Sequence, residues 1–394
     1  MAAPRTTAPP RASPMNDPRI RGLIYQAAVL AAVVWLGVEI WSNTAANLER
    51  ANIASGFGFL DNTAGFGIVQ SLIPYSEEAT YGRAFLVGLM NTLLVAAIGI
   101  VLATLLGFAV GIGSLSRNWL IRQICIVYVE TMRNIPLLLH IFFWYFAVLR
   151  SVPGPRDSLD VAGAVFINNR GIYLPRPVAE DGFGLVLAVF LAGLAGAWAL
   201  ARWARARRER TGETFPVLWA SAALVVVAPA LTFVAAGQPL SFDYPALSGF
   251  NFRGGIVLIP EFVSLVLALG IYTAGFIAEN VRSGILSVSR GQTEAAYALG
   301  LRPGPTMRLV IIPQAMRVII PPLTNQYLNL TKNSSLAVAI AYPDLVSVFA
   351  GTVLNQTGQA VEILLLTMSV YLTLSILTSL AMNWYNRRIA LVER

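Results

Sequence analysis

Repeated apolar runs are the feature that most constrains how this chain can fold. Several of them continue for about twenty residues, which is the length that an α-helix needs to cross the hydrocarbon core of a bilayer. Over 394 residues, 56% of the side chains are hydrophobic and only 12% are charged. We therefore expect an all-α, polytopic membrane protein.

The apolar runs predict eight spans. They cover residues 23–41, 84–113, 121–149, 183–203, 215–236, 260–281 and 360–385, with an interrupted segment at 318–350. The first run is too long for a typical signal-peptide core and is followed by no convincing cleavage site, so we expect an uncleaved anchor. The segment before it is rich in Pro, Ala and Thr and is expected to be disordered, with Met15 as an alternative start.

The formal net charge of +8 and the pI of about 9.9 are interpreted as membrane topology rather than nucleic-acid binding. Basic residues of membrane proteins gather in cytoplasmic loops. When the amino terminus is placed in the cytoplasm, most arginines of the loops fall on that side, including the five between residues 202 and 210. Both termini are then predicted to be cytoplasmic.

Cysteine and histidine are too rare for several classes of site. The single cysteine, Cys125, excludes an intramolecular disulfide and a cysteine-ligated metal site. The single histidine, His140, excludes a histidine-rich metal site and is interpreted as a packed residue rather than a proton relay. No metal site is expected, and no nucleophile motif of a membrane-embedded enzyme is present.

The stretch EAAYALGLRPGPTMRLVIIPQA, residues 294–315, separates two of the most apolar runs. Ser289 and Gln292 before it have the spacing of a capping box. Gly300 stands where a left-handed C-terminal cap is needed, and Pro303 and Pro305 block continuation of the helix. The pattern predicts an isolated cytoplasmic helix of about ten residues, which is marginal in water without a partner.

Two interpretations of this helix remain open at this stage. Its alanines permit close approach by a groove on a partner protein, and Glu294 offers an anionic anchor near the helix start. The alternative is an ordinary amphipathic connector between two spans.

The spacing of the stretch matches a known motif. It consists of E-A-A, three residues, G, nine residues, and then two aliphatic residues one position apart followed by P. The matching residues are Glu294, Ala295, Ala296, Gly300, Val310, Ile312 and Pro313. This pattern resembles the EAA coupling loop of ABC importer permeases, which usually has Ile and Leu at positions 310 and 312. The resemblance implies that the short helix docks into a groove on a separate ATP-binding subunit.

Three further segments resemble the polar amino acid permeases, the group of histidine, arginine and glutamine importers. They are YVETMRNIPLLLHIFFWYF (128–146), IAENVRSGI (277–285) and PQAMRVIIPPLTNQYLNLTKNSSLAVAI (313–340). The last has Asn333 where many relatives carry Asp. The anchor and the two extra spans resemble the larger permeases of general L-amino acid importers. Those extra spans are expected to pack peripherally rather than to line the path.

The resemblance implies a transport subunit without catalytic residues. The only lysine, Lys332, lies in LTKNSS rather than in a phosphate-binding loop, so ATP and Mg are expected on the partner ATPase and no cofactor on this chain. The implied partners are a dimer of ATP-binding subunits, a second permease subunit and a periplasmic amino-acid-binding protein in the bacterial inner membrane. An ion-coupled secondary carrier remains the alternative function.

Ionisable and polar residues at membrane depth are candidates for the substrate path, because they are costly there and usually face a cavity or a partner. Pro321, Pro322 and the run 331–335 are expected to interrupt their helix, so that free amides and a positive dipole end meet the substrate carboxylate. Glu130 or Glu279 would face its ammonium group. Alternatives remain: Glu130 and Arg133 pair with each other, and Arg282 and Glu362 reach the membrane interface. The candidate path residues are Glu130, Arg133, Glu279, Lys332, Asn333, Ser334 and Ser335.

The predicted domains follow from the spans and the resemblance. They are a disordered cytoplasmic tail (1–20), a transmembrane anchor (21–43), a periplasmic loop (44–83), the first part of the permease core (84–150), an insertion with periplasmic loops and two extra spans (151–259), and the rest of the core with the coupling loop (260–394).

Overall fold

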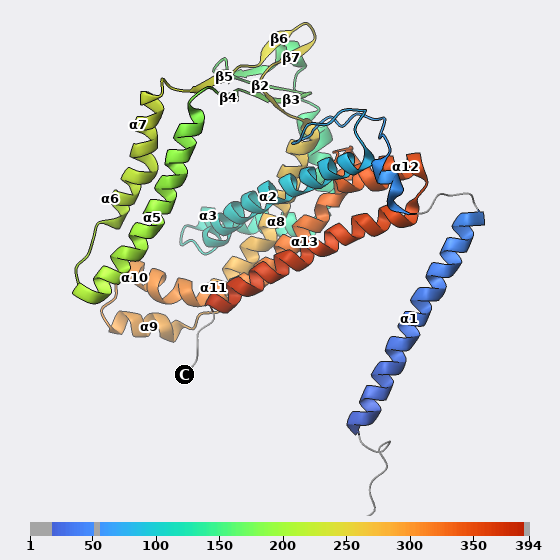
Figure 1. Cartoon of the computed structure of the whole chain (residues 1–394). Coiled ribbons are helices and arrows are strands. Elements are labelled where there is room, and N and C mark those ends of the chain that lie inside the picture. The colour runs from blue at the N-terminus through green and yellow to red at the C-terminus, as the bar shows by residue number, and fades with distance from the viewer. Residues whose placement is uncertain (1–17, 51–55, 390–394) are drawn as a thin grey trace, which may run out of the picture. The chain divides into compact units, whose positions relative to one another are not determined.

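Figure 1 shows the computed structural model, in which residues 18–50 and 56–389 are described. Of the tail predicted to be disordered (1–20), residues 1–17 and the alternative start at Met15 lie outside these ranges, whereas residues 18–20 already belong to a helix. The described residues are mostly helical, as predicted. The α-helices are α1 (Pro18–Arg50), α2 (Tyr81–Gly113), α3 (Trp119–Asn134), α4 (Leu137–Phe142), α5 (Phe183–Thr211), α6 (Val217–Ala222), α7 (Ala228–Ala235), α8 (Pro260–Leu286), α9 (Arg290–Ala298), α10 (Pro303–Thr306), α11 (Ile312–Asn333), α12 (Leu354–Thr357) and α13 (Ala360–Ile389).

Shorter turns extend or connect these helices. Tight 3₁₀ turns form η2 (Phe57–Asp61), η4 (Pro155–Asp157) and η7 (Ser334–Ile340). Wider π-helical turns form η3 (Phe143–Leu149), η5 (Ala223–Val227), η6 (Met307–Ile311) and η8 (Val346–Val353). Such π-helical turns are rare in proteins, and here they extend α4, α6 and α10 and precede α12.

Within the described ranges, seven helices are long and apolar enough to cross a membrane, and an eighth span is counted if one bent pair forms a single crossing. The pair consists of residues 119–134 and 137–149, which are bent by 108°. The run predicted as the third span, residues 121–149, is therefore sharply bent rather than one straight helix. Pro136 explains the bend, because the residue before a proline avoids helical geometry, and Ile135 has extended φ and ψ of −102° and 130°.

The predicted break at Pro321 and Pro322 is wrong. Both prolines lie inside α11, which belongs to a continuous helical segment from residue 303 to residue 340. Prolines are tolerated in membrane helices when neighbouring groups satisfy the freed backbone. The helix changes character only at Ser334, where α11 gives way to η7.

The described residues fall into two compact units, which are considered separately: residues 18–50, 56–91 and 343–377 in one, and residues 92–342 and 378–389 in the other. In the first unit, Phe59, Tyr81, Phe349 and Ile363 form a buried cluster. Asp344 is fully buried there, and its carboxylate accepts hydrogen bonds from the Ser347 amide and the Tyr371 hydroxyl.

The second unit is built around α8. In its most apolar stretch 67% of the residues are buried, compared with 6% in α5. Helices α3 and α11 pack against α8, and small residues permit close approach. Gly107 and Gly111 of α2 lie against Ile277 and Ala278 of α8. These contacts make α8 the central helix of this unit.

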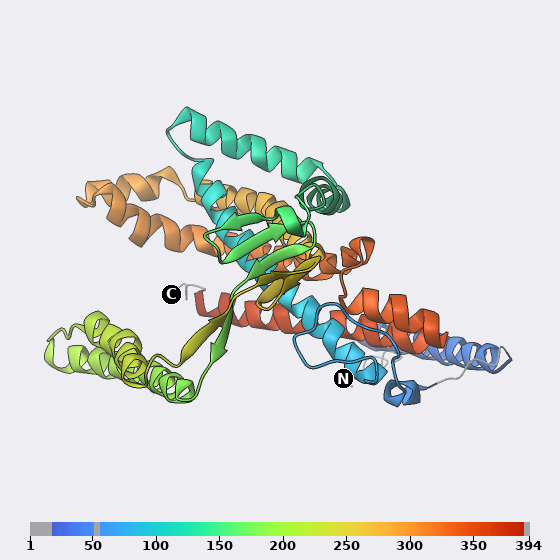
Figure 2. The ribbon, with the colours of Figure 1, turned by 90° about the horizontal axis from the view of Figure 1, so that it is seen from above.

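The insertion at 151–259 contains eight short strands that the sequence analysis did not predict. They are β1 (Leu159–Val161), β2 (Val165–Asn168), β3 (Gly171–Leu174), β4 (Arg176–Ala179), β5 (Leu240–Asp243), β6 (Ala246–Ser248), β7 (Asn251–Arg253) and β8 (Ile256–Leu258). One antiparallel sheet has the order β1-β2-β3-β8, with Phe166 opposite Tyr173 and Tyr173 opposite Val257, and β6 pairs with β7. Strands β4 and β5 pair at the base of a helical hairpin (Figure 2).

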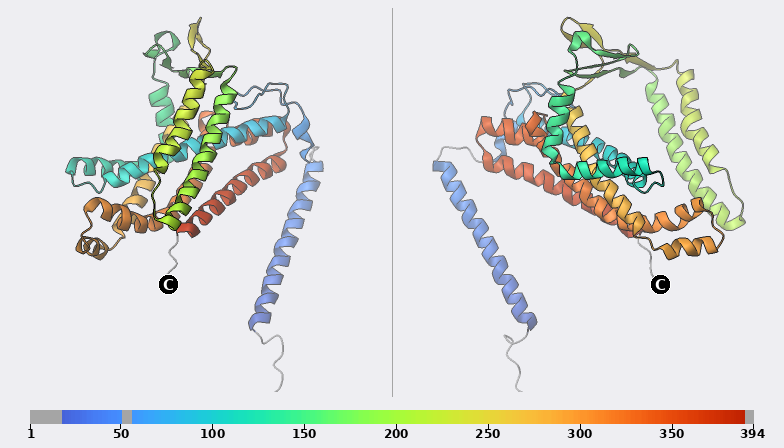
Figure 3. Two further views of the ribbon diagram at one scale, coloured as in Figure 1. Left: turned by 60° about the vertical axis from the view of Figure 1, so that its left-hand side comes forward. Right: turned by 180° about the vertical axis from the view of Figure 1, so that it is seen from behind.

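That helical hairpin consists of α5 and the helix formed by α6, η5 and α7. The two run side by side (Figure 3) and correspond to the two extra spans of the sequence analysis. Close approach is possible because Gly193 of α5 has no side chain, and a Cβ there would collide with the Leu224 carbonyl. The role of these spans at the periphery of a path stays a prediction.

Gly111→Ala tests the close contact between α2 and α8. A Cβ at residue 111 would lie 2.7 Å from the Ala278 carbonyl oxygen, so a helix has to shift. We expect a loss of about 1–3 kcal/mol in the free energy of unfolding, measured as a lower melting temperature in detergent. Gly184→Ala is the control, because a Cβ there meets nothing within 4 Å. Equal melting temperatures for the two variants would contradict the close contact.

Candidate functional site

The stretch that begins at Glu294 folds into a short, separately capped helix. Helix α9 has nine residues and ends at Ala298. The Gly300 amide donates to the Tyr297 carbonyl at 2.9 Å, and the Leu301 amide donates to the Ala296 carbonyl at 3.1 Å. This pair of bonds is a Schellman motif, and Gly300 adopts the left-handed φ of +77° that the motif requires. The predicted left-handed cap is confirmed.

The predicted capping box at the start of α9 is wrong. Ser289 is the N-cap residue and has extended geometry, but its side chain makes no capping hydrogen bond. The Gln292 side chain instead accepts a hydrogen bond from the Gln314 side chain of α11 at 3.3 Å. A spacing match cannot distinguish these arrangements, because the second partner is distant in sequence.

One side of α9 is held by this chain and the other is open. Ala296 is only 3% exposed, and α9 packs against α10 and η6. Glu294 and Ala295 are exposed, and Leu299 is 82% exposed. Beyond the turn, Val310 lies in η6, and Ile312 and Pro313 begin α11. The seven motif residues therefore form one segment with an exposed, partly apolar surface.

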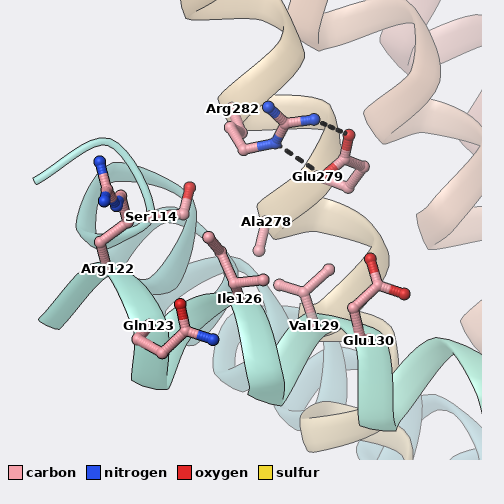
Figure 4. Close-up of a pocket in the computed structure, with 9 residues that line it drawn as sticks. All are labelled: Ser114, Arg122, Gln123, Ile126, Val129, Glu130, Ala278, Glu279 and Arg282. Atoms are coloured by element: carbon pink, nitrogen blue, oxygen red, sulfur yellow. Dashed lines mark hydrogen bonds and ion pairs between the residues drawn. The ribbon is translucent and has the colours of Figure 1, made fainter. Parts of the chain in front are cut away.

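A polar cavity lies between α3 and α8 (Figure 4). Its volume is about 490 Å³. Two of the predicted path residues line it, Glu130 from α3 and Glu279 from α8, so the structure brings together carboxylates that are far apart in sequence. The lining residues are Ser114, Arg122, Gln123, Ile126, Val129, Glu130, Ala278, Glu279 and Arg282.

An ion pair forms the α8 side of this cavity. The Arg282 guanidinium donates to both oxygens of Glu279, at 2.9 Å from Nε and 2.6 Å from Nη2. The bidentate geometry fixes both side chains. From the sequence, one alternative for Arg282 is a side chain that reaches the membrane interface. In the structure its guanidinium pairs with Glu279, one helical turn earlier on α8.

Glu130 and Arg133 have separate contacts. The Glu130 carboxylate accepts a 3.4 Å hydrogen bond from the Asn134 amide group, and the Arg133 guanidinium lies 5.8 Å from the centre of the Phe276 ring. Among the described residues no ion pair joins Glu130 to Arg133, so the pairing alternative is not supported. Glu130 remains an exposed carboxylate on the cavity wall.

The other predicted path residues lie at the end of α11 and do not line this cavity. Lys332 is exposed, and Asn333 is the last residue of α11. The hydroxyl of buried Ser334 donates to the Thr331 carbonyl, and the hydroxyl of Ser335 donates to the Lys332 carbonyl. Because η7 continues the helical segment beyond Asn333, no helix begins at this point that could present free amides. The predicted break that would place a positive dipole end at residues 331–335 is therefore wrong, and a contact of these residues with a substrate carboxylate stays a prediction.

Two other ionisable residues are placed by packing. His140 is 6% exposed, with its ring centre 5.6 Å from that of Tyr272, in agreement with a packed residue. Glu362 is 7% exposed, and its carboxylate accepts a hydrogen bond from the Gly56 amide at 2.7 Å. Glu362 is therefore buried within the protein, and its position at the membrane interface stays a prediction.

The sequence analysis missed three polar residues of the cavity, namely Ser114, Arg122 and Gln123. Ser114 directly follows α2, and Arg122 and Gln123 lie in the first turns of α3. In the sequence, Arg122 was interpreted only as a loop arginine that indicates membrane topology. For Arg122 and Gln123 the available clue was their spacing of four and three residues from Ile126, which itself lies four residues before Glu130, because such residues share one side of a helix. Ser114 lies outside α3 and gave no such signal.

Comparisons with known proteins cover nearly the whole chain. The family of binding-protein-dependent transport system inner membrane components matches residues 184–391. The chain is 55% identical over 384 residues to the general L-amino acid transport system permease protein AapQ of Rhizobium johnstonii, with 97% of this chain and 95% of the relative aligned.

Two further relatives align over 96% of each chain. The putative amino-acid ABC transporter permease protein YhdX of Escherichia coli is 54% identical over 382 residues. The glutamate/glutamine/aspartate/asparagine transport system permease protein BztB of Rhodobacter capsulatus is 44% identical over 413 residues.

A double-mutant cycle of Glu279→Gln and Arg282→Gln tests the ion pair of the cavity. We expect a coupling free energy of about 0.5–1 kcal/mol in thermal unfolding. The comparison is the Arg176–Asp243 pair, whose arginine is 58% exposed compared with 38% for Arg282, and it should show weaker coupling. A coupling no larger than that of the exposed pair would contradict the bidentate geometry.

Proposed function

Because the chain belongs to the family of binding-protein-dependent transport system inner membrane components, we propose that it is the permease subunit through which an ABC importer moves polar L-amino acids inward. The chain is a transport component rather than an enzyme. The substrate class rests on the relatives, one named for general L-amino acids and one for glutamate, glutamine, aspartate and asparagine. These relatives give no support to an ion-coupled carrier.

The open side of α9 is the observation that carries the proposed coupling. A nine-residue helix is marginal alone, yet α9 exposes Glu294, Ala295 and Leu299 on its free side. A groove on an ATP-binding subunit would bury these residues. ATP and Mg would be bound and used by a dimer of those subunits, with no cofactor on this chain.

The contacts of α9 supply a route for force into the membrane helices. Helix α9 follows α8 directly in sequence and packs against η6, which continues into α11. The side chains of Gln292 and Gln314 join α9 to α11. Helices α8 and α11 meet closely at Gly284, where a Cβ would collide with Ile319. A displacement of α9 would therefore be transmitted to both helices as a unit.

The cavity between α3 and α8 is proposed as part of the substrate path. An amino acid carries an ammonium group, and the cavity offers the Glu130 carboxylate for it, while Arg122, about two helical turns away on α3, adds positive charge at the other end of the cavity. Glu279 and Arg282 are already paired and would hold the α8 side in place. The other proposed path residues do not line this cavity. They are Arg133, Lys332, Asn333, Ser334 and Ser335.

The remaining partners and the orientation belong to the same proposal. A second, different permease subunit would complete the membrane pathway, and a periplasmic binding protein would deliver the amino acid. Both termini are proposed to be cytoplasmic in the bacterial inner membrane, because that orientation puts the arginine-rich loops inside.

Gly300→Ala should uncouple transport from the ATPase. The left-handed φ of +77° costs a residue with a Cβ about 1–2 kcal/mol, so the Schellman turn and the end of α9 should be disturbed. We expect lower ATP-dependent amino acid uptake in vesicles that contain the complete importer, and less ATPase subunit co-purified with the permease. Gly291→Ala, within α9 itself, is the control. Equal uptake by the two variants would argue against α9 as the coupling element.

Glu130→Gln tests the substrate path separately from coupling. Loss of one charge-assisted hydrogen bond to the substrate should raise the KM of uptake by about tenfold, while co-purification of the ATPase stays unchanged. Glu209→Gln, at an exposed carboxylate outside the cavity, is the control. An unchanged KM would remove Glu130 from the path without affecting the coupling proposal.

A further inference from the structure

The arginine-rich end of the helical hairpin contains a second cavity with a composition unlike the first. It lies where α5 meets the start of α6 and has a volume of about 300 Å³. Its walls combine two arginines with small and apolar side chains, and no acidic residue lines it. The lining residues are Ala201, Ala204, Arg205, Arg208, Thr214, Phe215 and Val217.

The neighbouring arginines already have partners within the hairpin. The Arg207 guanidinium donates to the Glu213 carboxylate at 2.6 Å and lies 5.3 Å from the centre of the Trp203 ring. The Arg202 guanidinium lies 4.6 Å from the centre of the Trp198 ring. These contacts account for two of the five arginines between residues 202 and 210.

Arg205 and Arg208 differ from these neighbours. They stand three residues apart on α5, which places both side chains on the cavity side of the helix. Neither guanidinium has a hydrogen bond or an ion pair with another residue in the described part of the chain. Two adjacent cations without a counter-ion in a shared cavity favour an anionic ligand whose oxygens accept several N–H groups.

The position of the cavity indicates where that anion comes from. Helix α5 changes from apolar to arginine-rich at residue 202, as expected where a helix leaves the hydrocarbon core. Trp198 and Trp219 are 63% and 77% exposed, and such tryptophans mark the headgroup level of a bilayer. Leu218, 76% exposed beside the cavity, offers a surface for an acyl chain.

We propose that this cavity binds the phosphodiester headgroup of an anionic phospholipid, with Arg205 and Arg208 on the phosphate and with Phe215 and Val217 against its glycerol and upper acyl chains. Basic cavities between membrane helices are a known means of lipid recognition. The extra hairpin would thereby be anchored at one leaflet by a specific lipid. This inference does not depend on the transported substrate.

The test measures how phosphatidylglycerol stabilises the full chain in phosphatidylcholine nanodiscs. For the wild type, the melting temperature should rise with the fraction of phosphatidylglycerol. The double variant Arg205→Gln/Arg208→Gln should need about tenfold more phosphatidylglycerol for half of the effect. The double variant Arg202→Gln/Arg210→Gln removes the same charge from α5 outside the cavity and should respond like the wild type.

Three results would overturn the proposal. The first is an equal loss of response in both double variants, because diffuse surface charge would then explain it. The second is a lower melting temperature of Arg205→Gln/Arg208→Gln in phosphatidylcholine alone, because the arginines would then hold the hairpin itself. The third is equal stabilisation of the wild type by inorganic phosphate, because the cavity would then bind a small soluble anion rather than a lipid.

Discussion

Close contact of neighbouring helices with α8 is the constraint on which the second unit depends. Lipid tails are as apolar as leucine, so burial alone does not hold membrane helices together, and dispersion between closely packed surfaces has to do so. Glycines permit this approach at Gly107 and Gly111 of α2 and at Gly275 and Gly284 of α8. The same helix carries Glu279 and Arg282 into the polar cavity and leads into α9. Helix α8 thus lines the cavity and also leads into the segment proposed for coupling.

Helix α9 combines a fixed shape with an open surface. Its end is fixed by the two backbone hydrogen bonds around Gly300, and its inner side is fixed by Ala296 against its neighbours. Its outer side has no cover within the described chain, and Glu294, Ala295 and Leu299 are exposed there. The proposed coupling role, in which this segment transmits force and accepts a second protein, would need this division between a held side and a free side.

Local signals account for the features that the sequence analysis predicted correctly. Gly300 ends a helix because only glycine enters the left-handed region without strain, and this requires no distant partner. The spans follow in the same way from the length of each apolar run. The prolines were the less reliable signals: Pro136 produces the bend, whereas Pro321 and Pro322 are accommodated within α11. Which outcome a proline has depends on neighbours that satisfy the freed backbone groups.

The sequence by itself determined the membrane class, the approximate spans, the family and the segment around Glu294, because each depends on composition or on short spacing. Only the tertiary structure decided that Arg282 pairs with Glu279, that Glu130 faces the same cavity, and that Arg205 and Arg208 share a second one. The physical reason is that the apolar pattern of a helix does not fix its rotation about its own axis. Hydropathy predicts that a helix spans the membrane, but contacts with other helices set its angle about its own axis and so decide which polar side chains meet.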